Sequence, residues 1–218
     1  MKFPGTEKFV PAFSQIVLAC VLAAVSPASI ADAVSDYQRG LDAYRAGDIT
    51  GAMTPLKAAA DAGHADAQAL YGGILDSAEF DEEAAAYLGK AAEQNNAEGQ
   101  YGLAKLYVAG EAKAPNDTEA GKLMRAAAAQ GHDLANISLA LAYINRDARL
   151  GASNPDVPEA GQYILKAAEL GELRAVEVLA NAYRTGEYGL ATDPSKADQW
   201  ARQLSSMLGQ PPKKGGKK

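Results

Sequence analysis

The chain has 218 residues, of which 27 are acidic and 21 are basic, and its net charge at pH 7 is −6. This acidic balance argues against nucleic acid or an anionic membrane surface as the main partner. Cys20 is the only cysteine and lies close to the N-terminus, so the rest of the chain holds no disulfide framework and no cysteine nucleophile.

Residues 1–31 have the layout of a secretory signal peptide. Two lysines precede an apolar run over residues 16–25, and a stretch of small residues follows it. Cleavage after Ala31 and cleavage after Ala33 fit equally well, and a lipidated Cys20 is an alternative. Because the apolar run is too short to span a bilayer, we expect a periplasmic or secreted protein without a transmembrane segment.

The rest of the chain repeats one pattern around four turn residues, which are 32, 36 and 40 residues apart. These turn residues are Gly63, Asn95, Gly131 and Gly171. Large residues recur eight and twelve positions after each turn: Tyr71, Leu103, Leu139 and Leu179, then Leu75, Tyr107, Tyr143 and Tyr183. Repeat spacings of this size are typical of helical arrays, and the intervals of three and four residues within each unit predict helices rather than strands.

The pattern predicts an all-α solenoid of about five antiparallel helix pairs over residues 32–208. The expected pairs are 34–46 with 49–62, 65–77 with 81–94, 97–109 with 117–130, 133–145 with 157–170, and 173–185 with 194–207. Residues 209–218 are rich in lysine, glycine and proline and are predicted to be a disordered tail.

Three segments resemble one repeat family: Gly63–Gln68, Lys90–Asn95 and Asp193–Trp200. They are similar to the Sel-one-like repeat, a subfamily of tetratricopeptide-like arrays, and the resemblance covers residues 36–203. The resemblance implies a right-handed superhelix in which the first helix of each pair lines a concave face. It also implies a scaffold that binds proteins. Ala78 and Arg146 depart from the family pattern, which has glycine at the end of the first helix.

No residue pattern points to catalysis. His64 and His132 occupy the same position after a turn glycine, which favours a repeat position over a metal ligand, and no second ligand accompanies either. The acids at 81–83 suit the first turn of a helix. We therefore expect no enzyme, no metal and no cofactor.

The candidate binding residues follow from the expected concave face. If the first helices line that face, residues three, six, ten and thirteen positions after each turn point into a groove. The candidate partner-binding residues are Asp66, Asp76, Glu98, Tyr101, Lys105, Ile137, Leu141, Ile144, Arg174, Glu177, Asn181 and Arg184. Together with Leu134, the three central aliphatic residues form a strip that suits the apolar anchor of a peptide. The alternative is that the next helix pair buries this strip in the core.

These patterns predict an exported, non-catalytic scaffold that binds a protein or peptide partner in its groove. The alternative is a protein that binds or processes cell-wall saccharides, which would need exposed aromatic rings flanked by acids and amides. Tyr101 is the only aromatic residue among the predicted groove positions. A third hypothesis is a spacer that forms a homo-oligomer through the aliphatic strip.

Overall fold

The computed structural model of the protein describes residues 27–111 and 117–209. Over these ranges it contains ten α-helices, one short 3-10 helix and no strand. The helix pairs are α1 (Pro27–Arg45) with α2 (Ile49–Asp61), α3 (Ala65–Ser77) with α4 (Asp81–Glu93), α5 (Ala97–Ala109) with α6 (Asp117–Ala129), α7 (Asp133–Asn145) with α8 (Pro158–Glu169), and α9 (Leu173–Thr185) with α10 (Pro194–Met207). The predicted all-α solenoid of five helix pairs is confirmed.

One helix boundary differs clearly from the prediction. α1 begins at Pro27 rather than at residue 34 and includes both proposed cleavage positions. Proline suits the first turn of a helix because its missing amide has no partner there, and the alanines that follow favour helix. Most of the predicted signal peptide (1–26) and of the predicted tail (210–218) lies outside the described residues, so both remain predictions.

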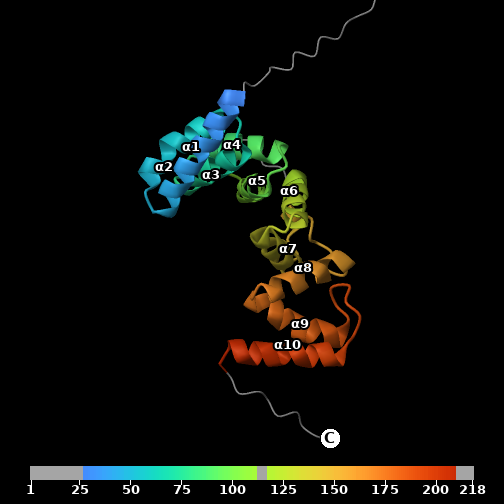
Figure 1. Cartoon of the computed structure of the whole chain (residues 1–218). Helices are drawn as coiled ribbons and strands as arrows, with labels where there is room; N and C mark the ends of the chain where they lie inside the picture. Colours follow the sequence, from blue (N-terminus) through green and yellow to red (C-terminus); the bar gives the residue numbers. More distant parts are fainter. Residues whose placement is uncertain (1–26, 112–116, 210–218) are drawn as a thin grey trace, which may run out of the picture.

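The five pairs stack in chain order from α1 to α10, as Figure 1 shows from blue to red. The second helix of each pair packs against the first helix of the next pair, and the first helices α3 and α5 also pack against each other. None of the helices in the described ranges is both long and apolar enough to cross a membrane.

The repeated small residues explain why the helices approach so closely. Ala52, Ala84, Ala120 and Ala160 are fully buried at equivalent positions of the second helices. A Cβ atom on Gly72 would lie 2.8 Å from Leu88 Cγ, so that position has no room for a side chain. The large residues of each unit fill the spaces between helices, as fully buried Leu139 and Leu179 illustrate.

The long loop between α7 and α8 packs back onto the preceding helix α6. The 3-10 helix η1 (Ala148–Leu150) contacts α6, and its Leu150 is buried. Arg125 of α6 donates from Nη1 to the Gly121 carbonyl and from Nη2 to the Tyr143 hydroxyl. This loop therefore extends the core at the junction where the repeat spacing is longest.

Candidate functional site

A hollow of about 480 Å³ lies on the face formed by the first helices α1, α3 and α5, and Leu134 at the start of α7 lines its edge. We call this hollow the N-terminal groove. Its lining includes Tyr37, Leu41 and Tyr44 from α1, Asp66, Ala69, Gly73 and Asp76 from α3, and Glu98, Tyr101 and Lys105 from α5. Five of the predicted site residues thus line one groove: Asp66, Asp76, Glu98, Tyr101 and Lys105.

The contribution of α1 to the groove was missed at the sequence level. Tyr37, Leu41 and Tyr44 lie six, ten and thirteen positions after Ala31, which is one 32-residue unit before Gly63. Alanine replaces the turn glycine there, within the predicted signal peptide, and the groove positions were counted only from the four turn residues, so the first helix gave no candidates. Extending the repeat spacing backwards from Gly63 would have found it.

This first unit corrects one premise of the sequence analysis. Tyr101 is not the only aromatic residue in the groove, because Tyr37 and Tyr44 line it as well. The Tyr44 residue is 40% exposed, and Tyr37 and Tyr101 are half-buried. The groove therefore combines three tyrosines with carboxylates.

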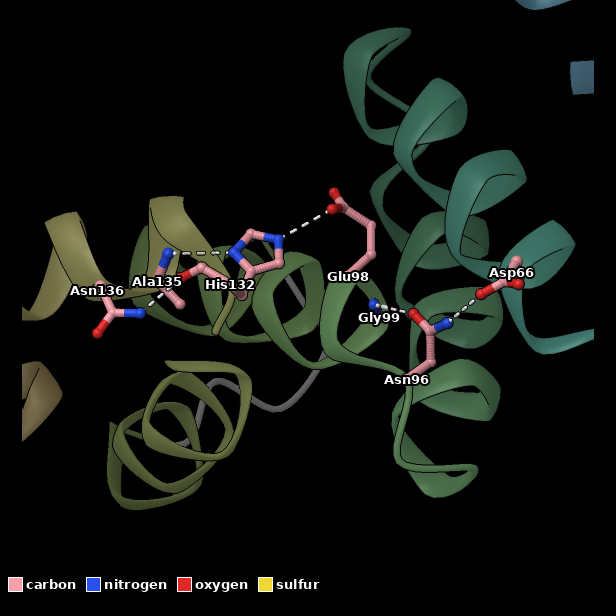
Figure 2. A network of polar contacts seen from close by, with 7 residues as sticks. All are labelled: Asp66, Asn96, Glu98, Gly99, His132, Ala135 and Asn136. Carbon is pink, nitrogen blue, oxygen red and sulfur yellow. Dashed lines mark hydrogen bonds and ion pairs between the residues drawn. The ribbon is translucent and has the colours of Figure 1, made fainter. Parts of the chain in front are cut away.

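Hydrogen bonds from the following unit hold two groove acids in place (Figure 2). Asn96, which precedes α5, accepts from the Gly99 amide at 2.9 Å and donates to Asp66 Oδ1 at 2.6 Å. His132, which precedes α7, plays the same part for Glu98, with 2.9 Å between His132 Nε2 and Glu98 Oε2. Each capping side chain thus links the start of its own helix to the groove acid of the preceding unit.

The histidines of the turns act as helix caps. His132 Nδ1 accepts from the Ala135 amide at 3.2 Å, and His64 Nδ1 accepts from the Ala67 amide at 3.3 Å. An Nδ1 atom that accepts a hydrogen bond carries no proton, so Nε2 of His132 is the atom that donates to Glu98. This cap satisfies one of the free amides at the helix start.

Two groove tyrosines stack on these histidines. The Tyr37 ring lies 4.5 Å from the His64 ring, and the Tyr101 ring lies 4.6 Å from the His132 ring, both centroid to centroid and near parallel. Burial, and then the nearby Asp66 carboxylate, raise the pKa of Tyr37, so its hydroxyl stays protonated at neutral pH. Each of these two tyrosines is thus held in position by the capping histidine of the following unit.

The groove lining carries more negative than positive charge. Lys105 Nζ lies 3.2 Å from Asp76 Oδ2 and compensates that carboxylate. Asp66 and Glu98, in contrast, are held by the uncharged amide of Asn96 and the imidazole of His132. The lining therefore carries three carboxylates and one amine, with its excess negative charge at Asp66 and Glu98.

One group of acids next to the groove was not anticipated. Carboxylate oxygens of Asp76, Asp81 and Glu111 lie within 4.8 Å of one another. Exposed acids gather in this way without an ion, and the amine of Lys105 already supplies a positive charge to Asp76. We assign no metal to this group.

The other predicted site residues lie elsewhere. Ile137 and Ile144 pack against the C-terminal core cluster, and Leu141 is half-buried. Arg174, Glu177 and Asn181 line a separate hollow of about 200 Å³. Arg184 pairs with Asp198 at 3.1 Å. The predicted positions therefore do not form one continuous groove along the described part of the solenoid.

No family model matches the chain, and no curated protein matches its sequence. Three solved structures are similar to it. A Sel1 repeat protein from Oxalobacter formigenes has a TM-score of 0.62 at 25% identity and covers 84% of this chain and 74% of its own. A protective antigen present in uropathogenic Escherichia coli strains, which displays an SLR fold, has a TM-score of 0.63 at 27% identity and covers 83% of this chain and 43% of its own.

The third structure is a putative sel1 repeat protein from Klebsiella pneumoniae, with a TM-score of 0.54 at 21% identity over 84% of this chain and 90% of its own. It supports the fold alone. With the helix pairs and the repeated columns, the first two structures support a Sel1-like repeat fold for this chain, an all-helical repeat solenoid.

Proposed function

We propose that this protein is an exported, non-catalytic scaffold that binds a segment of a partner protein in the N-terminal groove. The observation that carries the proposal is the lining of the groove by four successive first helices with three tyrosines among them. Tyrosines supply a large contact area at low entropic cost and are enriched in binding surfaces. The N-terminal sequence layout supports export.

The polar side chains of the groove are engaged in holding its shape. Asp66 accepts from Asn96, Glu98 from His132, and Asp76 pairs with Lys105. A surface whose side chains are already fixed loses less conformational entropy on binding. This arrangement favours recognition of a ligand over proton transfer to a substrate.

Gly73 offers a direct test, because it lines the groove within α3 and nothing lies within 4 Å of a Cβ atom built on it. A Gly73→Trp substitution therefore fills the groove without a clash at its base. Gly89 in α4 is the matched control, since it is also inside a helix but lines a different hollow, and its nearest contact would be Leu103 Cδ2 at 4.0 Å.

The experiment selects peptides from a random display library with the unmodified protein and measures their affinities by calorimetry. We expect enriched peptides that lose their affinity for Gly73→Trp and keep it for Gly89→Trp. Circular dichroism verifies that both variants are folded. Failure to enrich any peptide, or equal binding by Gly73→Trp, would contradict the proposal.

A second candidate is saccharide binding, and the presence of Tyr37, Tyr44 and Tyr101 beside carboxylates favours it. Aromatic rings and acids are the groups that this alternative required. Titration with soluble cell-wall oligosaccharides tests it in the same two variants. Saccharide binding that Gly73→Trp abolishes would replace the peptide proposal.

A further inference from the structure

We infer that the segment bound in the N-terminal groove is cationic and carries an arginine or lysine next to an apolar residue. This inference rests on the proposed function and specifies the chemistry of the partner. Its basis is the charge of the groove together with its aromatic and apolar side chains.

Two acids of the groove lack a positive partner among their hydrogen-bond donors. Asp66 is held by the amide of Asn96, and Glu98 by an imidazole whose Nδ1 accepts a hydrogen bond and which is therefore neutral. Neutral donors fix a carboxylate without cancelling its charge. Since 61% of the Glu98 side chain is exposed, its charge acts on whatever enters the groove.

The tyrosine rings of the groove offer a second attraction for a cation. Tyr37 and Tyr101 lie on the same helices as the neighbouring groove residues Leu41 and Lys105, and Tyr44 adds a third ring. Cations are attracted both to carboxylates and to the faces of aromatic rings. A guanidinium group satisfies both, because it is planar, stacks on rings and pairs with carboxylates through two hydrogen bonds.

Part of the groove lining is apolar. Leu41 and Leu70 are half-buried in the same lining, and Leu134 at the edge is 53% exposed. An apolar side chain of the partner would cover these residues and bury area that water now contacts. The groove thus favours a cation flanked by an apolar residue over an acidic or purely polar segment.

The experiment uses fluorescently labelled peptide pools with random flanks and a fixed centre of Arg-Leu-Arg, Gln-Leu-Gln or Glu-Leu-Glu. Anisotropy should show the arginine pool binding about tenfold more tightly than the glutamine pool, as expected for two partly exposed charge pairs. Raising the ionic strength to about 1 M, where the Debye length is about 3 Å, should remove this preference.

The double variant Asp66→Asn with Glu98→Gln removes two charges and retains acceptor oxygens for Asn96 and His132. It should bind the arginine pool no more tightly than the glutamine pool. The control, Glu93→Gln with Glu169→Gln, removes two exposed acids outside the N-terminal groove and should keep the preference. A second pair, Gly73→Lys against Gly73→Gln, tests the same point without altering the acids, since the lysine alone should repel the arginine pool.

Equal or tighter binding of the glutamine or glutamate pool would overturn the inference, as would a double variant that binds the arginine pool normally. The result for Gly73→Trp distinguishes a failure of the cationic inference from a failure of the proposed function. If that variant abolishes binding of a neutral or acidic pool, the groove binds peptides and only the cationic inference fails. If Gly73→Trp changes the affinity for none of the pools, the proposed function fails as well.

Discussion

His132 at the start of α7 and Glu98 at the start of α5 are joined by a contact of 2.9 Å between Nε2 and Oε2, although they are 34 residues apart in the chain. The same ring accepts from the Ala135 amide through Nδ1. One side chain therefore caps a helix and positions an acid of the preceding unit. Asn96 and Asp66 repeat the arrangement one unit earlier.

This double role predicts different effects for two substitutions of His132. His132→Ala removes the cap and should lower the free energy of unfolding by about 1 to 2 kcal/mol. His132→Asn should retain most of the stability, because asparagine caps the equivalent helix at position 96. Urea unfolding followed by circular dichroism measures both, and equal losses would contradict the capping role.

A hydrogen bond between Gln130 and the buried Gln100 provides a second prediction. Gln130 donates from Nε2 to Gln100 Oε1 at 2.8 Å, and Gln100 is only 5% exposed. Gln130→Leu leaves that oxygen without this donor and should cost about 1 to 2 kcal/mol of stability. Adding Gln100→Leu removes the stranded group, so the loss in the double variant should be smaller than the sum of the single losses. A double-mutant cycle measures the difference, and strict additivity would contradict it.

Arg146 yields a prediction of increased stability. It ends α7 with a φ of 56°, in the left-handed region, where the equivalent residue after α5 is Gly110 with a φ of 78°. A side chain in this conformation costs about 1 to 2 kcal/mol. Arg146→Gly should therefore raise the melting temperature, and the reciprocal Gly110→Ala should lower it. A lower melting temperature for Arg146→Gly would show that its side chain makes a compensating contact.

Asp61 gives a pH-dependent prediction. It accepts from Lys57 and from the Tyr87 hydroxyl, and these hydrogen bonds lower its pKa. Because the pKa is lower in the folded protein, the unfolded chain takes up the proton first as the pH falls. The contribution is complete above the unfolded value of about 3.9 and is lost as the pH drops through the folded value.

Asp61→Asn should accordingly be less stable than the unmodified protein at pH 7 and equally stable in strong acid. Since the group is largely exposed, the difference at pH 7 should be small, below about 1 kcal/mol. Denaturant unfolding over a pH series measures it. A difference that persists undiminished in acid would assign the effect to something other than this carboxylate.

The sequence predicted most of the fold because small and large residues recur in register. Every helix after α1 begins and ends within one residue of its predicted boundary, and Gly63, Gly131 and Gly171 all have the left-handed φ that their turns require. Arg146 takes this conformation without glycine. Ala78 is the other position that lacks the glycine of the family pattern. Its φ is −100°, and the next residue, Glu79, takes the left-handed conformation instead.

The binding surface was harder to predict because periodicity gives the direction of a side chain but not what covers it. Tyr101 and Asp76 line the N-terminal groove, whereas Ile137 and Ile144 at the equivalent positions of α7 are partly buried against the C-terminal core cluster. The difference follows from the neighbours. The loop between α9 and α10 brings Tyr188 into the same cluster as these isoleucines, and no pattern in the repeat specifies that contact.

Binding of the selected peptides to Gly73→Trp and Gly89→Trp, measured side by side, decides whether the N-terminal groove is the binding surface. Both substitutions place a tryptophan at a glycine inside a helix, and only the first one enters the N-terminal groove. The account predicts that affinity is lost for Gly73→Trp and retained for Gly89→Trp. Retained affinity in a folded Gly73→Trp variant would show that the groove is not the binding surface.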